Sequence, residues 1–397
     1  MKRSVNIKYF LLIIFFVLNS FSVSTSVKDK SYGDVNTEET LNKDMPLEFY
    51  PEATTHKVNQ RLDSLFNRFN KRHDFHGSVI IAQKGKVIFK NHYGYADFKK
   101  KSMIDDHSVF QLASVSKQFT AASILILYED GKLDLDDQVI KFFPDFPYKE
   151  VTVRQLMNHT SGLPKYFWLA EHKWKKEHAP SNKEMMDMLS KHDVQRFFSP
   201  GANFDYSNTG YFVLASIVEK VTNKNFGDFV DDKIFTPLHM KNTFVYRYEM
   251  DSIKEGQLDG FRIYRRRWHA KIGGTVNDAI VGDKNVYSTT EDMFKWIEGL
   301  NSGKIISKKT LDLMYTRGET RYNRKVPYGF GFRIKEDENS KVVYHNGKWN
   351  GFSSSLMQYP DDELVVITLE HSNYNSMKTL NEKVKQIVDS SFDPSNN

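Results

Sequence analysis

One short stretch of the sequence, residues 110–120, constrains the rest of the chain more than any other. It contains the only Ser-x-x-Lys in the chain, at Ser114 and Lys117, and it leads into an apolar run over 121–128 that ends at Gly131. A run of that length with a terminal glycine is typical of a buried helix with glycine as its C-cap. Residues three apart share one face of a helix, so we expect Ser114 and Lys117 to lie together in the first turn.

The pairing of Ser114 with Lys117 is a chemical hypothesis. A serine hydroxyl is a poor nucleophile until a neighbouring base takes its proton. A lysine can be that base only if burial or a nearby positive charge lowers its pKa. The positive end of a helix disfavours a further positive charge, and its free N–H groups stabilise an oxyanion. The alternative is a helix cap followed by a solvated lysine, which is the usual meaning of so short a motif. The apolar helix favours catalysis, because it sets the motif against a core.

A second segment, Tyr206-Ser207-Asn208, carries side chains that serine acyl transfer requires. Such a site needs a proton shuttle for the leaving group and donors for the oxyanion. Tyr206 could shuttle protons if Lys117 beside it lowers its pKa. The Asn208 amide could orient Lys117 and the substrate. Because a predicted helix follows over 211–221, Tyr206 can project from a loop into a cleft.

A third segment, His345-Asn346-Gly347, is predicted at the end of a β-run, where a backbone edge is free to pair with an extended substrate. The alternative is a simple turn between two strands. Tyr344 and Asn346 also match a Tyr-x-Asn pattern, but we prefer Tyr206 because of its position in a loop.

Three other stretches have structural interpretations. His159, in a turn rich in Asn, Ser, Gly and Pro, could be a catalytic base, but we favour a role in holding that loop by side-chain hydrogen bonds. Residues 165–200 are predicted to form a variable lid or wall over a cleft. Residues 256–285 are basic and include Arg265-Arg266-Arg267, which we interpret as a solvated loop in preference to a docking site for an anionic polymer.

The order of the predicted elements indicates an α/β (α+β) fold. We expect an antiparallel sheet built from both ends of the chain and flanked by N- and C-terminal helices, with a largely helical region inserted between the two halves of the sheet. The amphipathic and apolar patterns place helices at 56–72, 153–157, 211–221, 289–300 and 377–388, and β-runs at 77–83, 86–90, 341–344, 353–359 and 363–370.

Composition excludes several classes of function. The net charge of the 397 residues is +6, and half of it comes from residues 1–26, which is too little to indicate a nucleic-acid partner. The absence of cysteine excludes disulfides. Other catalytic schemes lack support in the sequence, because there is no Gly-x-Ser-x-Gly, His-Glu-x-x-His, phosphate loop or Gly-x-Gly-x-x-Gly. We expect neither a metal nor another cofactor.

The first 26 residues have the pattern of a secretory signal peptide. A basic start precedes an apolar core over 9–18, and small residues follow over 22–26. The core is too short to span a bilayer comfortably. We therefore expect export to the periplasm or the cell exterior and no stable membrane span after cleavage. The alternative is an uncleaved N-terminal anchor. A linker over 27–54, a domain over 55–392 and a tail over 393–397 complete the predicted organisation.

Together these motifs resemble the class C β-lactamase-like serine hydrolases, a family that includes penicillin-binding D-amino-acid peptidases and related esterases. The resemblance covers residues 56–390. Besides the Ser-x-x-Lys, it rests on the order and spacing of Gly77-Ser78-Val79, Gly94-Tyr95-Ala96-Asp97, the segment 159–164, Tyr206-Ser207-Asn208, the segment 286–289, the segment 328–332 and His345-Asn346-Gly347.

The resemblance implies an active site between an α/β sandwich and a helical region. It implies that Ser114 forms an acyl-enzyme, that Lys117 and Tyr206 act as base and acid, and that Asn208 orients the substrate. The backbone N–H groups of Ser114 and of a residue just beyond Gly347 would form the oxyanion hole.

His345 stands where β-lactamases and peptidases often carry the lysine of Lys-Thr-Gly. Histidine is mostly neutral at pH 7, which weakens the expectation of carboxylate binding and of efficient β-lactamase action. The resemblance thus predicts an exported serine hydrolase whose substrates are small molecules or peptides, including D-amino-acid peptides of the cell-wall type. A carboxylesterase, or a penicillin-binding module without turnover, remains open on the same site.

Overall fold

The computed structural model describes residues 46–393 except 193, 248–252 and 265–267. Some predicted features lie wholly or partly outside the described residues: the leader over 1–26, the linker over 27–54, the run Arg265-Arg266-Arg267 and the tail over 393–397. Within the described part of the chain, no helix combines the length and the apolar character that a membrane span requires.

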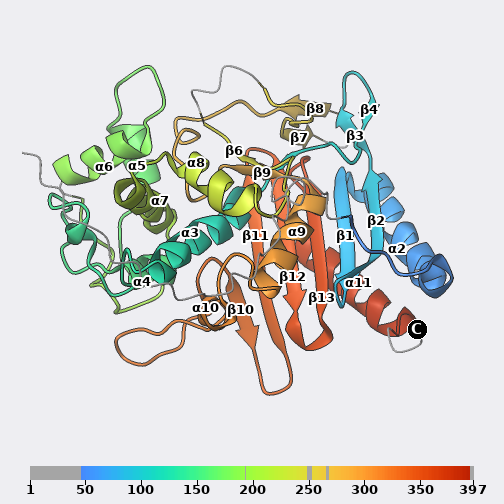
Figure 1. Ribbon diagram of the computed structural model, residues 1–397. Helices are drawn as coiled ribbons and strands as arrows, with labels where there is room; N and C mark the ends of the chain where they lie inside the picture. Colours follow the sequence, from blue (N-terminus) through green and yellow to red (C-terminus); the bar gives the residue numbers. More distant parts are fainter. Residues whose placement is uncertain (1–45, 193, 248–252, 265–267, 394–397) are drawn as a thin grey trace, which may run out of the picture. The chain divides into compact units, whose positions relative to one another are not determined.

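A six-stranded antiparallel sheet organises the described chain (Figure 1). The strand order β10-β11-β12-β13-β1-β2 puts the first strands of the sheet beside the last ones. Ile80 of β1 lies opposite Ile367 of β13, so the two ends of the chain form one sheet, as predicted. The strands are β1 (Gly77–Gln83), β2 (Lys86–Tyr93), β10 (Arg333–Glu336), β11 (Lys341–Trp349), β12 (Phe352–Tyr359) and β13 (Leu364–Glu370).

Both faces of the sheet are covered, because alternate residues of each strand enter different cores. In β1, Ile81 packs into a smaller core with α2 (Glu52–His73) and α11 (Met377–Ser391). Its neighbour Ile80 packs into the larger core beneath the inserted helices. Because α2 begins at Glu52, residues 52–54 of the predicted linker are helical.

The region between β2 and β10 is largely helical, as predicted. Its helices are α3 (Lys117–Glu129), α4 (Val153–Met157), α5 (Tyr166–His172), α6 (Asn182–Lys191), α7 (Asn208–Thr222), α8 (Phe226–Val230), α9 (Thr290–Asn301) and α10 (Lys308–Met314). Its short strands are β3 (Tyr95–Asp97), β4 (Ser102–Met103), β5 (Phe110–Gln111), β6 (Phe244–Val245), β7 (Phe261–Tyr264), β8 (Trp268–Lys271) and β9 (Val286–Ser288).

The helix α3 is buried on all sides, as its apolar sequence predicts. Every residue from Lys117 to Leu127 is buried. The helix ends in a Schellman-type turn: Gly131 follows the C-cap Asp130 with a left-handed φ of 67°, and the N–H of Lys132 donates to the Leu127 carbonyl. Burial on all sides fixes α3, and with it the position of Lys117.

The smaller core gives a stability prediction. Phe66 of α2 is fully buried and stacks on Phe89 and Tyr93 of β2. We expect Phe66→Ala to lower the free energy of unfolding by about 3–5 kcal/mol, because it removes a large apolar side chain and leaves a cavity. Denaturant unfolding measures this change. The control is Phe197→Ala, since Phe197 is 56% exposed. Equal stability of the two variants would contradict the assignment of Phe66 to a packed core.

Candidate active site

The candidate nucleophile Ser114 lies in a single 3₁₀ turn, η1 (Ala113–Ser116), between β5 and α3. We expected it in the first turn of α3, but α3 begins only at Lys117. Ala113 has a left-handed φ of 49°, which is uncommon for a residue with a side chain. Residues three apart eclipse one another in a 3₁₀ turn, so Ser114 and Lys117 still face each other.

Lys117 is fully buried, and its Nζ has three hydrogen-bond partners. Nζ lies 3.3 Å from Ser114 Oγ, 2.8 Å from Asn208 Oδ1 and 2.7 Å from the backbone oxygen of Asp283. Burial lowers the pKa of Lys117 to about 7, against the raising effect of the Asp283 carboxylate, and the positive charge of Arg333 acts in the same direction as burial. Much of the Lys117 amine is therefore uncharged at neutral pH.

The partners of Lys117 determine how an uncharged amine points. Asn208 Oδ1 and the Asp283 carbonyl can only accept hydrogen bonds. They take the two hydrogens of the neutral amine and leave its lone pair for Ser114 Oγ. In that state the Ser114 hydroxyl donates to Lys117, which is the geometry that a general base requires.

Tyr206 and Asn208 flank the residue that caps α7, because the Ser207 side chain accepts the capping hydrogen bond. Lys117 Nζ lies 5.0 Å from the centroid of the Tyr206 ring. The condition that we set for Tyr206, a pKa lowered by Lys117, is not met: burial raises this pKa, and the Ser114 hydroxyl and the charge of Arg333 offset burial only in part. Tyr206 is therefore a neutral phenol at physiological pH.

His159 holds the loop that carries Tyr206. It is fully buried, and its Nδ1 accepts a hydrogen bond from the Ser207 N–H at 3.1 Å. Its backbone oxygen accepts another from the Asp205 N–H at 3.0 Å. Burial and the charge of Lys117 hold the pKa of His159 well below its usual value. These contacts confirm the loop-holding role that we favoured.

The segment His345-Asn346-Gly347 lies inside β11, so its predicted place at the end of a β-run is wrong. Alternation along the strand separates its side chains. Asn346 Oδ1 accepts a hydrogen bond from Ser355, which itself accepts one from Asn381 of α11. The Asn346 side chain thus lies on the α11 side of the sheet, away from Ser114.

The His345 side chain is buried and uncharged. Its Nε2 lies 3.0 Å from the Tyr328 hydroxyl, and its Nδ1 lies 2.8 Å from the Asn346 carbonyl oxygen. Burial first, and then the charges of Lys117 and Arg333, hold the pKa of His345 well below its usual value. His345 therefore offers no positive charge to a substrate.

Gly347 brings β11 against the backbone of the nucleophile turn. A side-chain carbon at this position would overlap the Leu112 carbonyl oxygen and would lie 3.0 Å from the Ser114 backbone nitrogen. Ser354, opposite Gly347 on β12, donates to the same Leu112 oxygen at 2.5 Å. Glycine permits this close approach, which places the Ser114 N–H next to β11.

Arg333 is a site residue that the sequence analysis missed. Its guanidinium carbon lies 4.9 Å from the centroid of the Tyr206 ring, and its charge lowers the pKa of Lys117, His159 and His345. The side chain is partly exposed. Arg333 directly follows the segment 328–332, one of the motifs on which the family resemblance rests. This position is the signal that could have identified it.

The region 165–200, predicted as a lid or wall, begins in contact with the site. Tyr166, the first residue of α5, is fully buried, and its hydroxyl donates to Asp283 Oδ2 at 3.0 Å. Asp283 is the residue whose backbone oxygen binds Lys117. The start of this region therefore packs behind the candidate base, and a covering role for its remainder stays a prediction.

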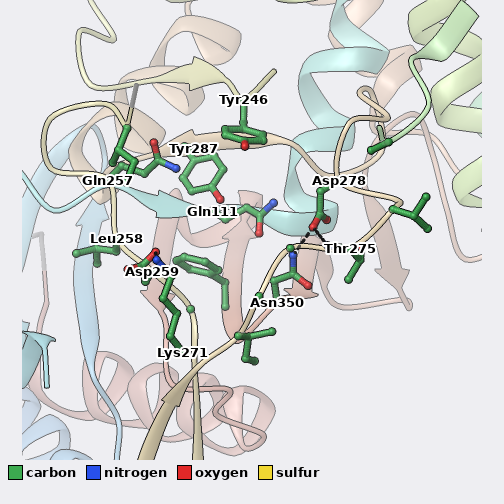
Figure 2. Close-up of a pocket in the computed structure, with 18 of the residues that line it drawn as sticks. Gln111, Tyr246, Gln257, Leu258, Asp259, Lys271, Thr275, Asp278, Tyr287 and Asn350 are labelled. Carbon is green, nitrogen blue, oxygen red and sulfur yellow. Dashed lines mark hydrogen bonds and ion pairs between the residues drawn. The ribbon is translucent and has the colours of Figure 1, made fainter. Parts of the chain in front are cut away.

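A cavity of about 600 Å³ is lined by Gln111 of β5, by Tyr287 of β9 and by Asn350, among other residues (Figure 2). None of the predicted site residues lines it. Asp278 stands at its edge and accepts hydrogen bonds from Trp349 at 2.6 Å and from Asn350 at 3.0 Å, the second of which Figure 2 draws. The cavity thus begins where β11 ends, and part of its wall comes from the predicted basic loop 256–285.

Across the residues that the structure describes, no group of three or more His, Cys, Asp or Glu side chains is placed to hold a metal ion.

Comparison with known proteins adds an independent finding. A sequence model of the family described as Beta-lactamase matches residues 62–389. Penicillin-binding protein 4* of Bacillus subtilis (strain 168) is 32% identical over 327 residues, which cover 79% of this chain and 72% of that protein.

Solved structures show the same fold at lower identity. The octameric penicillin-binding protein homologue from Pyrococcus abyssi has a TM-score of 0.72 and 24% identity, over 84% of this chain and 78% of that one. The D-amino acid amidase from Ochrobactrum anthropi SV3, in complex with D-phenylalanine, has a TM-score of 0.67 and 24% identity, over 85% of this chain and 99% of that one.

The contact between Gly347 and the nucleophile turn gives a second prediction. We expect Gly347→Ala to slow acylation of Ser114 by an activated ester about a hundredfold, because relief of the overlap with the Leu112 carbonyl oxygen displaces the turn by about 1 Å, which disrupts the reacting geometry. Stopped-flow kinetics measures the rate. Gly273→Ala is the control, because a side-chain carbon there meets no other atom within 4 Å. Unchanged acylation in folded Gly347→Ala would contradict the close approach.

Proposed function

Because the chain belongs to the beta-lactamase family, we propose that it is a serine hydrolase that forms an acyl-enzyme through Ser114 and acts on D-amino-acid peptides of the cell-wall type or related amides. The observation that carries the proposal is the contact of Ser114 Oγ with Lys117 Nζ, whose other two partners are both acceptors. That contact supports a role for the buried Lys117 amine as the base that takes the proton of the Ser114 hydroxyl.

In the proposed reaction, Ser114 Oγ bonds to the substrate carbonyl carbon while Lys117 takes the hydroxyl proton. The amide C–N bond then breaks as Tyr206 donates its phenolic proton to the leaving nitrogen and receives the proton held by Lys117. The raised pKa of Tyr206 suits an acid that stays protonated until that step. Water attacks the ester with these roles reversed, and Ser114 is restored. Asn208 orients the Lys117 amine throughout.

We place the substrate along the free part of β11. β10 pairs only with residues 341–344 of β11, so from His345 onward that edge has no strand partner among the described residues. An extended peptide can add to such an edge by main-chain hydrogen bonds. The N–H groups of Ser114 and of Lys348, the residue after Gly347, would then hold the oxyanion. The backbone of Asn346 would contribute to this edge, whereas its side chain lies away from it.

A D-peptide with a free carboxylate is the preferred substrate class. Arg333 supplies a fixed cation near Tyr206 that neutral His345 does not. Arginine suits carboxylates because its planar group can donate two parallel hydrogen bonds. The names of the similar proteins, a penicillin-binding protein and a D-amino acid amidase, support the same class.

Two alternatives use the same site. A carboxylesterase is favoured by the neutral His345, because an ester substrate needs no cation at that position. A penicillin-binding module would acylate at Ser114 and deacylate too slowly for turnover. Comparison of turnover of a D-Ala-D-Ala peptide with that of a short aryl ester separates these alternatives from the amide hydrolase.

We also propose that the protein is exported, with residues 1–26 as the cleaved leader. The basic start and short apolar core of this segment support export. Retention of the leader as an N-terminal anchor is the alternative, and sequencing the N-terminus of the mature protein distinguishes the two.

The acyl-enzyme gives the third prediction. Brief exposure of residues 27–397 to a penicillin, and separately to an activated ester, should add one acyl group to the intact mass. Ser114→Ala should abolish the addition, and Lys117→Ala should slow it by orders of magnitude, because the nucleophile then lacks its base. Ser116→Ala is the control in the same turn. An adduct that persists in folded Ser114→Ala would refute the assigned nucleophile.

Arg333 gives the fourth prediction. We expect Arg333→Met to lower kcat/KM about tenfold to a hundredfold for a peptide ending in a free carboxylate, since it removes a charge-assisted contact. For the same peptide with an amidated terminus, the kcat/KM of Arg333→Met should fall much less. Steady-state kinetics on both peptides measures the ratio, with the exposed Arg321→Met as control. Equal losses on both peptides would mean that Arg333 does not read the carboxylate.

A further inference from the structure

A second buried lysine, Lys284, lies behind the proposed base. It is 2% exposed, and its Nζ donates to the Tyr166 hydroxyl at 2.6 Å, to Asp283 Oδ1 at 3.1 Å and to the Ile280 carbonyl at 3.4 Å. The Tyr166 hydroxyl in turn donates to Asp283 Oδ2 at 3.0 Å. The three hydrogens of an ammonium group and both carboxylate oxygens thus have partners.

The surroundings of Lys284 suit an ammonium ion. Its Nζ lies 5.3 Å, 5.4 Å and 5.2 Å from the ring centroids of Tyr166, Phe167 and Trp349. Aromatic faces attract cations at such distances. Burial lowers the pKa of Lys284, whereas the Asp283 carboxylate opposes that effect by attraction and by its hydrogen bond. Lys284 and Asp283 therefore form a buried ion pair with complete hydrogen bonding.

Asp283 contacts both lysines, but with different atoms. Its backbone oxygen accepts from Lys117, and its carboxylate accepts from Lys284. Lys117 has only uncharged hydrogen-bond partners, whereas Lys284 has a carboxylate. The two lysines therefore differ in the type of their partners: those of Lys117 favour a neutral amine, and those of Lys284 favour an ammonium ion.

This difference between the two lysines matters because Asp283 is fully buried. A buried carboxylate without a paired cation would attract a proton to the nearest amine. That amine is Lys117, which cannot accept the Ser114 proton while it is an ammonium. With Lys284 charged, the pair carries no net charge, so the Asp283 carboxylate raises the pKa of Lys117 less than an unpaired anion would.

We propose that Lys284 is a positioning residue for Lys117: it neutralises the Asp283 carboxylate, so that Asp283 can hold the Lys117 amine through its backbone without turning that amine into an ammonium. This role rests on the proposed function only where it concerns acylation. The proposal gives a function to Lys284, a buried cation that takes no part in the steps of the proposed reaction.

Other charged or titratable groups also face this pair of lysines. Arg333 lowers the pKa of Lys117 from the β10 side, and Asp278 raises that of Lys284. The other titratable neighbours are uncharged: His159, His345, Tyr166 and Tyr211 are buried, and Tyr206 is partly buried. The Tyr211 ring centroid lies 5.5 Å from Lys117 Nζ. Each stays in place in the variants below, so a change in Lys117 reports on Asp283 and Lys284.

The fifth prediction concerns the protonation of Lys117 itself. NMR titration of protein labelled with ¹³C and ¹⁵N in lysine follows the Lys117 Cε and Nζ signals, assigned with Lys117→Ala. Lys284→Met should raise the Lys117 midpoint by about one pH unit, because the carboxylate loses its cation. Asp283→Asn should lower it, because the anion is gone. The double variant should return it toward wild type, and Lys284→Arg should leave it nearly unchanged.

The control removes another Lys–Asp pair, on α9, in which Asp292 is buried and Lys295 is partly buried. Lys295 Nζ lies 3.0 Å from Asp292 Oδ1 on α9, so Lys295→Met should destabilise the fold without moving the Lys117 midpoint. If Lys284→Met does not fold, the isosteric Asp283→Asn decides alone. An unchanged or raised midpoint in folded Asp283→Asn, or shifts of the same sign in both single variants, would overturn the proposal.

A parallel measurement separates this inference from the proposed function. The rate of acylation by an activated ester, followed against pH, should have an acidic limb that moves with the Lys117 midpoint. One unit below the wild-type midpoint, Lys284→Met should acylate about tenfold more slowly, with a similar rate limit at high pH. Midpoints that shift in a protein whose Ser114 never acylates would refute the hydrolase and leave the charge compensation standing. Acylation of Ser114 with unchanged Lys117 midpoints in the variants would refute the charge compensation and leave the hydrolase standing.

Discussion

Burial of the Lys117 amine is the constraint on which the rest of the site depends. An amine removed from water keeps its charge only if an anion pairs with it, and otherwise loses its proton. Here the neighbours are a hydroxyl, an amide oxygen and a backbone oxygen, from Ser114, Asn208 and Asp283. They come from three distant parts of the sequence, so the proposed base is assembled only in the completed fold.

The six-stranded sheet fixes the position of η1, the turn that carries Ser114. β11 is paired with β12 along its length, and Gly347 lets it contact the turn without a side chain between them. Ser354 fixes the same turn from β12 through the Leu112 carbonyl. Because α3 is buried on all sides, the turn cannot move independently of the helix that follows it. The positions of nucleophile and base are therefore set by packing, which suits a reaction sensitive to small displacements.

The sequence predicted the contacts that depend on short spacing and left out those that depend on tertiary packing. Ser114 and Lys117 are three residues apart, and that spacing brings them together in either kind of helical turn. The strand alternation that turns Asn346 away from the site could be judged only when β11 was known to continue beyond Gly347. For Tyr206, burial outweighed the neighbouring charge that we expected to decide its pKa. Lys284 is one of 56 basic residues, and no local pattern marks it as one that enters the core, whereas the position of Arg333 directly after the segment 328–332 could have identified it.

Lys117, Lys284 and Arg333 are the three basic residues of the site, and their different surroundings determine how a carboxylate substrate would act on the base. Arg333 is partly exposed and lowers the pKa of Lys117 in the free protein. A substrate carboxylate bound to Arg333 would cancel much of that effect at the moment when Lys117 must be neutral. The ion pair of Lys284 with Asp283 is buried and does not contact that substrate group, so its compensation would persist in the complex. In the proposed reaction, the partly exposed Arg333 would serve recognition, while the buried Lys284 would preserve the base that recognition would otherwise weaken.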